Sequence, residues 1–357
     1  MSSSKEQFSG NIFIFDAFDV GDDINLEKIR TDSAIMTRAY SQPKYFKHYH
    51  LPLSVELPHP HDSTKCESVK IYNFGAISLL YKIPFEDSLE NVRMQLVSID
   101  NQFREQSIID SRSVFKKIKP YVKKTRFFHT KTSYVMVQVN PKPNLDVQQL
   151  KQKYGGIITS LVRFETETLS EYQKDEILDS SIGYLKGDLI VIDSEAAFVY
   201  DPVPEEILDI FEFANIQQLE LRFFDRLLDQ KLNKIYEEEE TAKIPISSYL
   251  PIIGMLSKGP VDELSRLKVD ISVIAERLEG AIRLVGEPYF AELYALLNDR
   301  LDLNNLNESI TKKLAIIRDI QQVWQQKLES VHEDLLTTLI IILIFIELVI
   351  GTLHYFK

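Results

Sequence analysis

Cysteine is almost absent from this chain, which holds a single one, Cys66, among 357 residues. One thiol cannot form a disulfide within the chain, and this excludes the disulfide-rich scaffolds of small secreted proteins. The first residues also lack the apolar core of a secretory signal and the Arg-rich amphipathic pattern of a mitochondrial presequence. These absences lead us to expect a protein that works in a reducing compartment.

The sequence also lacks the short motifs that mark common enzymes, including glycine-rich phosphate loops, the nucleophile elbow and the His-Glu-x-x-His zinc motif. Hydrophobic residues make up 44% of the chain and charged residues 26%, as in an ordinary folded protein. The formal net charge of -12 disfavours a chain that coats nucleic acid with its whole surface, so we expect no DNA partner. We expect a protein that is not an enzyme and uses no cofactor.

The first 203 residues are predicted to form one domain of mixed secondary structure. Apolar, β-rich runs occur at residues 11–15, 69–83, 134–139, 157–162, 189–192 and 196–200. Apolar residues spaced three and four apart predict a helix over residues 87–106, and a shorter helix is predicted over 175–185. Because no regular strand–helix–strand repeat appears, we expect an α+β class with a mixed α/β sandwich in this domain, residues 1–203.

Residues 204–334 are predicted to form a helical coiled-coil stalk after the two prolines at 202 and 204. A first helix is expected to end near Tyr236, and a second carries the clearest heptad pattern, from Leu264 to Val285. A third has an apolar residue at every seventh position from Leu296 to Val331. Such a series packs either as an antiparallel hairpin within one chain or between chains, and we expect a homo-oligomer.

Residues 335–353, LLTTLIIILIFIELVIGTL, carry one charge, Glu347. Their length is close to the roughly 20 residues of a membrane-spanning helix. They predict one C-terminal transmembrane helix, hence a tail-anchored, single-pass membrane protein whose bulk is cytoplasmic; the alternative is a buried core helix. Glu347 is expected either to be tolerated near the membrane boundary or to contact a second copy of the helix.

Four of the seven histidines form two His-x-His pairs, and neutral imidazole is a common zinc ligand. The pairs consist of His48, His50, His59 and His61. Their spacing matches no standard metal motif, and nearby prolines favour an exposed loop. A metal-dependent enzyme that uses this cluster is the alternative function.

Between residues 112 and 131 the chain carries eight basic residues and no acid, against its overall negative charge. They are Arg112, Lys116, Lys117, Lys119, Lys123, Lys124, Arg126 and Lys131. Aromatic residues are interleaved with them, a mixture that suits binding of RNA or of anionic lipid headgroups. The other interpretation is a solvated basic face whose aromatic rings turn into the core.

Several stretches resemble a known family, among them YNFGAISLLY, FEFANIQQLELRFFDRLLDQKLNKIY and LYALLNDRLDLNNLNESITKKLAIIRDI. The resemblance is to the uncharacterised "required for meiotic nuclear division" proteins of eukaryotes and their bacterial relatives, and this chain looks like a bacterial member. The family implies no catalytic residues, and it favours contact of Glu347 with a second copy. Because one mitochondrial member of the family is thought to hold ribosomes at a membrane, the resemblance implies a similar role for this chain. We therefore expect a membrane-anchored, non-enzymatic scaffold that self-associates, displays a cytosolic domain and holds a ribosome, RNA-containing or other protein partner at the bilayer.

Overall fold

The computed structural model describes residues 6–39, 51–57, 65–127, 130–241, 269 and 288–355. Its helices are α1 (Leu26–Thr31), α2 (Leu89–Ile118), α3 (Val147–Val162), α4 (Glu171–Asp179), α5 (Glu205–Thr241), α8 (Pro288–Arg300) and α9 (Leu303–Tyr355). A short 3-10 helix, η1 (Lys119–Tyr121), follows α2, and a small ribbon pairs β2 (Asp23–Ile24) with β6 (Val122–Lys123).

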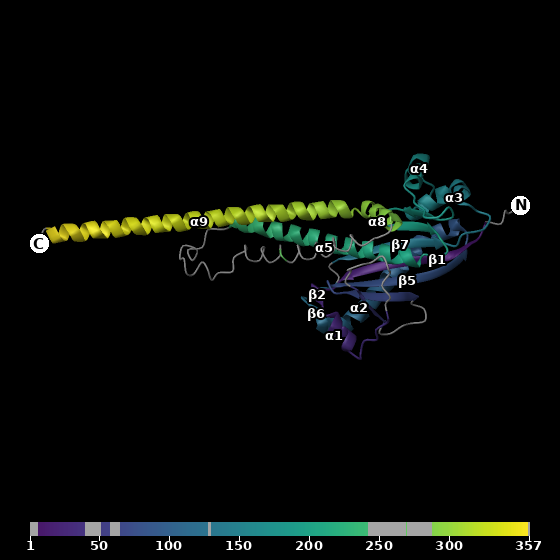
Figure 1. Ribbon diagram of the computed structural model, residues 1–357, viewed down its shortest axis with the longest axis horizontal. Coiled ribbons are helices and arrows are strands. Elements are labelled where there is room, and N and C mark those ends of the chain that lie inside the picture. The colour runs from purple at the N-terminus through teal and green to yellow at the C-terminus, as the bar shows by residue number, and fades with distance from the viewer. Residues whose placement is uncertain are drawn as a thin grey trace. The chain divides into compact units, whose positions relative to one another are not determined.

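A mixed sheet of seven strands forms the centre of the α+β domain (Figure 1). In order across the sheet, the strands are β3 (Leu53–Val55), β4 (Cys66–Tyr72), β5 (Ala76–Asp87), β1 (Phe8–Asp19), β7 (Lys131–Val139), β9 (Ala196–Tyr200) and β8 (Leu189–Ile192). Strands β7 and β9 run parallel, and the other neighbours are antiparallel. The predicted α+β class is confirmed.

Helices cover both faces of the sheet because the side chains of a strand alternate between its faces. On one face Ile14 and Phe18 of β1 share a core with Leu96 of α2 and Ile158 of α3. On the other face Ala17, Tyr72 and Ala76 of the strands, with Phe74 of the β4–β5 turn, pack with Ile216 and Leu219 of α5. Helices α2 and α3 therefore pack on one face of the sheet, and α5 packs on the other.

The run at residues 157–162, which the sequence analysis predicted as a strand, is the last part of α3. Asp146 and Gln149 form a capping box at the start of this helix, with 2.8 Å between the Asp146 carboxylate and the Gln149 backbone nitrogen. The apolar side chains of Ile158 and Leu161 are then buried on one side of a helix. A short apolar run is compatible with a buried helix as well as with a strand. Here the capping box stabilises the start of the helix that contains the run.

The chain divides into two compact units, and α5 and α9 contribute residues to both. The first unit comprises Met1–Phe223 with Glu276–Asn307, and the second comprises Phe224–Ala275 with Glu308–Lys357. The boundary predicted after residue 203 falls inside the first unit, because the first half of α5 covers the sheet there. Within this unit α8 is joined to α5, where Gln218 donates a hydrogen bond of 2.9 Å to the carbonyl of Leu301.

In the second unit α5 and α9 run in parallel. Ser309 donates a hydrogen bond of 2.7 Å to Asp225, and Lys313 lies 2.7 Å from both Asp225 and Asp229. The predicted third helix, over residues 296–331, is interrupted between α8 and α9, where Asp302 has a φ of 60°. The predicted second helix, over residues 264–285, lies almost entirely outside the described residues.

Residues 335–353 lie within α9, and the expectation that they cross a membrane is not supported. Over the part of the chain that the structure describes, no helix is both long and apolar enough for a membrane span. A span needs about 20 consecutive residues. This finding overturns the predicted transmembrane helix, the tail anchor and the single-pass membrane location.

Candidate functional site

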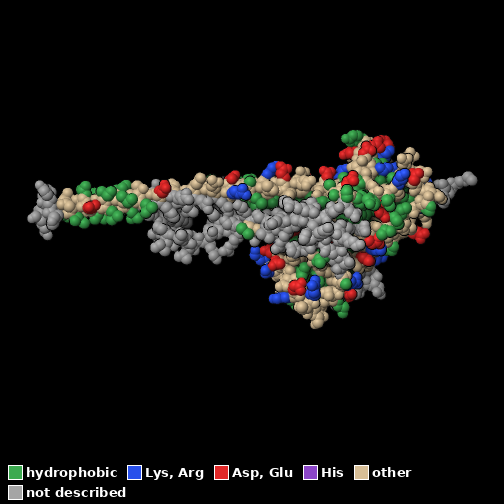
Figure 2. All heavy atoms as spheres, in the orientation of Figure 1, with side chains coloured by type: hydrophobic (Ala, Val, Ile, Leu, Met, Phe, Trp, Pro, Cys, Tyr) green, Lys and Arg blue, Asp and Glu red, His purple; other side chains and the backbone are tan. Residues whose placement is uncertain are grey.

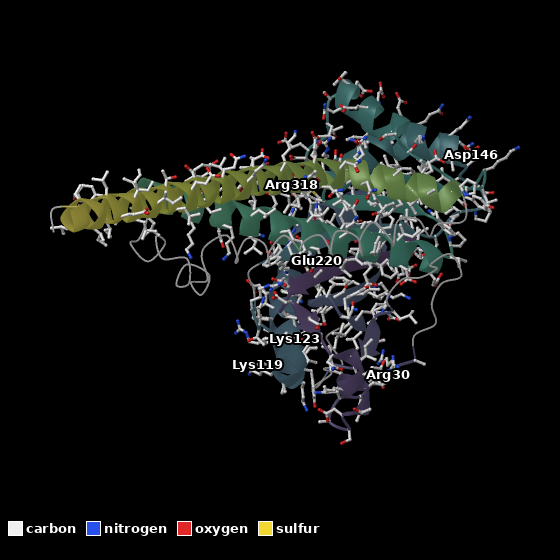
Figure 3. The ribbon with its side chains drawn as sticks, turned by 60° about the vertical axis from the view of Figure 1, so that its left-hand side comes forward. Arg30, Lys119, Lys123, Asp146, Glu220 and Arg318 are labelled. Carbon is white, nitrogen blue, oxygen red and sulfur yellow. The ribbon has the colours of Figure 1, made fainter. Side chains whose placement is uncertain are left out.

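The basic stretch forms one end of the α+β domain, running from the last turns of α2 through η1 and β6 to the start of β7. Figure 3 labels Lys119 and Lys123 at this end of the molecule. The side chains of Lys116, Lys117, Lys119, Lys123 and Lys124 are exposed, as is that of Arg112. The structure therefore brings most of the predicted anion-binding residues to one region of the surface.

Four of these cations are paired with carboxylates of β1, the β1–β2 turn and β2, which lie about a hundred positions earlier in the chain. The pairs are Lys123 with Asp23 at 2.7 Å, Lys124 with Asp22 at 2.9 Å, Arg126 with Asp19 at 2.6 Å and Lys131 with Asp16 at 3.1 Å. The local charge is thus much more balanced than the sequence between residues 112 and 131 implies.

Two of the interleaved aromatic rings turn towards the core. The rings of Phe115 and Phe127 stack with centroids 5.0 Å apart, and Phe127 also stacks on Phe18 at 6.4 Å. Both Phe115 and Phe127 pack against the main hydrophobic core. Phe128 lies outside the described residues. Tyr121, a third interleaved ring, is half-buried and also packs against this core. These contacts leave less aromatic surface on which bases or headgroups would stack.

Arg126 is held from several directions at once. Its Nε donates to Asp19 at 2.6 Å, one terminal nitrogen donates to Asp22, and the other donates to the carbonyl of Gly21 at 3.0 Å. The guanidinium carbon lies 3.9 Å from the centroid of the Phe223 ring on α5, within the range of a cation–π contact. Arg126 therefore links the β1–β2 turn to α5 and is committed to contacts within the chain.

Glu220, one helical turn before Phe223, completes this group, which we call the Arg126 cluster (Asp19, Asp22, Arg126, Glu220 and Phe223). The Glu220 side chain is 1% exposed, and no described residue donates a hydrogen bond to either of its carboxylate oxygens. Burial, and then the negative charge of Asp19, raise the pKa of Glu220 well above its ordinary value, and Arg126 offsets only part of this rise. Figure 3 places Glu220 on α5, over the strands of the sheet.

The backbone around the Arg126 cluster is fixed by two turns in close contact. The Val20 nitrogen donates to the carbonyl of Gly75 at 2.8 Å, and the Arg126 nitrogen donates to the carbonyl of Val20 at 3.0 Å. Gly75 has a φ of 108°, and a Cβ there would lie 1.7 Å from the carbonyl oxygen of Gly21. Only glycine fits this position, which belongs to the YNFG stretch that the sequence analysis singled out.

A second polar cluster lies on the opposite face of the sheet, under α2. Lys131 lies 3.1 Å from the carboxylate of Asp16 and 3.0 Å from the hydroxyl of Ser107. Burial lowers the pKa of Lys131, and burial also raises the pKa of Asp100, which is paired with Arg104 at 2.6 Å. Both Asp16 and Asp100 are paired with a cation, so the arrangement is typical of buried structural ion pairs rather than of a reactive amine.

The four histidines of the proposed metal site, His48, His50, His59 and His61, lie outside the described residues. Among the residues that are described, no group of three or more His, Cys, Asp or Glu side chains is arranged to hold a metal ion. Burial raises the pKa of the Cys66 thiol to about 12, so this side chain stays protonated and unreactive near neutral pH.

The family described as "Uncharacterized protein MJ0711, N-terminal domain" matches residues 9–205, which is more than half of the chain. The chain belongs to this family. Asp19, Asp22, Gly75 and Arg126 lie within the matched region, so most of the Arg126 cluster is part of the MJ0711 N-terminal domain. Glu220 and Phe223 of α5 follow it.

Two relatives extend this comparison. The uncharacterized protein MJ0711 of Methanocaldococcus jannaschii is 26% identical over 265 residues, 72% of this chain and 78% of the relative. The sporulation protein RMD1 of Saccharomyces cerevisiae is 22% identical over 142 residues, 39% of this chain and 32% of the yeast protein. The predicted resemblance to the meiotic nuclear division proteins is thus supported at the level of a weak similarity to this yeast protein. No solved structure shows a significant match.

Sequence reasoning found Arg126 but missed its partners in the MJ0711 family domain. A signal was present, because Asp16 and Asp19 interrupt a strand that is otherwise apolar, NIFIFDAFD. Glu220 likewise stands between Leu219 and Leu221 in the helix. Burying an ionised carboxylate without a partner costs free energy. Each of these positions therefore predicts either a cation beside the carboxylate or a protonated carboxyl group.

Proposed function

We propose that this chain is a non-enzymatic scaffold that self-associates through the C-terminal part of α9 and displays its α+β domain to a partner. The observation that carries the proposal is the apolar series from Leu339 to Leu353. Its large apolar side chains are all exposed, from 37% for Val349 to 66% for Phe345 and Leu353. Figure 2 shows apolar side chains along this end of the helix. Exposed apolar surface of this extent marks an interaction site.

A second copy of α9 is the occupant that the helix geometry favours. Two contacts fix how α5 and α9 are aligned: Asp225 pairs with Ser309, and Asp229 pairs with Lys313, each 84 positions further along the chain. With the same offset, Thr241, the last residue of α5, lies level with about residue 325 of α9. Beyond this level α5 no longer accompanies α9. A second α9 offers an apolar surface of the same length, and side-by-side packing of such helices buries both.

Glu347 is the one charged residue in this apolar series. In an assembly of α9 helices its carboxyl group needs a hydrogen-bond partner, because burying it alone would cost several kcal/mol. The proposal therefore keeps the expectation that Glu347 contacts a second copy of the helix.

Leu343→Glu tests self-association of the full chain. Leu343 is 63% exposed, and burying a carboxylate in the interface is expected to raise the concentration for half-dissociation at least about tenfold. Sedimentation velocity over a range of concentrations measures this shift. Ile109→Glu is the matched control, because Ile109 is also 63% exposed but lies on α2. A parent chain that stays monomeric at every concentration, or a monomer that instead binds lipid vesicles, would overturn the proposal.

The partner that we propose for the α+β domain is an anionic, RNA-containing surface such as a ribosome. Lys116 and Lys119, exposed at the end of α2 and in η1, support this choice. That the chain is a bacterial member of its family stays a prediction from the sequence. The sporulation role in the name of the yeast relative is not carried over to this chain.

Neutralising Lys116 and Lys119 to Gln together is expected to weaken cosedimentation with ribosomes. Each cation that contacts a phosphate contributes about one unit to the salt dependence of binding, so the slope should fall by about two. The matched control neutralises Lys123 and Lys124, whose charges face Asp23 and Asp22, and should change the slope less. Equal effects of the two pairs, or no binding by the parent chain at low salt, would contradict this assignment.

A further inference from the structure

Helix α5 is attached to the sheet through an unusual number of polar side chains. Among the residues of α5 that are at most 5% exposed are Glu212, Asn215, Gln217, Gln218 and Glu220. Most of these have a direct partner. The side-chain amide of Asn215 donates to the backbone carbonyl of Phe15, and the backbone carbonyl of Asn215 accepts from the hydroxyl of Thr132. Glu212 lies 2.7 Å from Lys70. Glu220 is different, since no described donor reaches its carboxylate.

The charges around Glu220 do not balance if every carboxyl group is ionised. Asp19 reaches the cluster from β1, Asp22 from the β1–β2 turn and Glu220 from α5. Among the described residues, the ion pairs of these acids involve Arg126, which contacts both aspartates, and Lys124, which lies 2.9 Å from Asp22 and is largely exposed. One proton on Glu220 removes a negative charge from a side chain that is 1% exposed and has no described hydrogen-bond donor.

We propose that Glu220 is a proton-dependent latch, which holds α5 on the β1–β2 turn while it is protonated and releases this part of the helix when it ionises. This inference does not depend on the proposed self-association. The geometry supplies the reason. Glu220 lies one helical turn before Phe223, whose ring contacts Arg126, and an ionised Glu220 would be repelled by the buried carboxylate of Asp19. The guanidinium of Arg126 is already committed to Asp19, Asp22 and Gly21.

The direction of the pH dependence follows from linkage. Because the pKa of Glu220 is raised in the folded chain, the folded state holds a proton that the unfolded or detached state gives up. Attachment of α5 is therefore strongest at low pH, below the ordinary pKa of a glutamate. It weakens as the pH rises from that value towards the raised pKa of the folded state.

Hydrogen exchange of the full chain tests the latch. Amide protection in the part of α5 near Glu220 is measured from about pH 5 to about pH 9 and corrected for the intrinsic pH dependence of exchange. In the parent chain this protection should fall by up to about tenfold per pH unit, the limit for release of one proton. Glu220→Gln keeps the shape of the protonated group and should abolish the decrease. Glu105→Gln, at an exposed position of α2, should leave it unchanged.

A second measurement does not require the variant to fold well. The infrared spectrum of the parent chain at neutral pH should contain the band of a buried protonated carboxyl group, and Glu105→Gln should retain it. Identical pH profiles for the parent chain and Glu220→Gln would overturn the proposal. A neutral-pH spectrum of the parent chain without the protonated carboxyl band would overturn it as well.

Discussion

Arg126→Met should lower the free energy of unfolding by about 3 to 5 kcal/mol, the usual cost of removing one partner from a buried ion pair. Arg126 is 15% exposed, and its partner Asp19 is fully buried. Methionine replaces much of the volume of the side chain but none of its donors. Asp19 is then left beside Glu220 with no guanidinium between them, and the contact with the Phe223 ring loses its cation.

Urea denaturation of the full chain, followed by circular dichroism, measures this loss. Lys123→Met is the matched control, because Lys123 also pairs with an aspartate, but its side chain is 76% exposed. Exposed pairs contribute little, so the control should unfold near the parent. If Arg126→Met proved as stable as Lys123→Met, the Arg126 cluster would not be holding α5 and the turn together.

Gly75→Ala should be destabilising by about 2 to 6 kcal/mol, which combines the strain of a positive φ with the cost of overpacking. The φ of 108° is unfavourable for any residue with a Cβ. The added methyl group would also lie 1.7 Å from the carbonyl oxygen of Gly21, so one of the two turns has to move. This movement would disturb Gly21, whose carbonyl accepts a hydrogen bond from Arg126.

The same denaturation experiment includes Gly187→Ala for comparison. A Cβ at Gly187 would meet no described atom within 4 Å, and its φ lies outside the region that favours glycine. Alanine at this position should therefore be tolerated. Equal stabilities for the two alanine variants would show that the β4–β5 turn does not approach the β1–β2 turn as closely as described.

Local patterns in the sequence predicted the elements of the fold better than their partners. An apolar, β-rich run predicted a strand over residues 11–15, but β1 extends from Phe8 to Asp19. The apolar run ends where Asp16 begins, although the strand continues through this buried acid. Likewise α2 continues to Ile118, beyond the predicted end at residue 106, and buries Ser107, Asp110 and Ser111. Tertiary partners make these polar residues acceptable in the interior, and a local pattern contains no information about them.

The basic stretch shows the same limit for the candidate site. Eight cations without an acid form a clear local signal, but the acids that face them lie about a hundred positions earlier in the chain, as with Asp23 and Lys123. The heptad series of α9 was informative about burial, since Leu303, Ile310 and Ile317 are at most 3% exposed. It did not indicate that α5 would run alongside α9 in parallel, because a heptad specifies an apolar seam and leaves its partner open.

The first unit draws residues from two distant parts of the chain, and this affects the order in which a growing polypeptide can fold. The sheet is complete once Tyr200 has been synthesised, but the apolar cluster that includes Tyr72 and Phe74 also needs Ile216 and Leu219 of α5. The unit also includes α8 and the first residues of α9, up to Asn307. Most of the polypeptide must therefore be synthesised before this unit can close, and the apolar sheet face stays exposed, and prone to aggregation, until then.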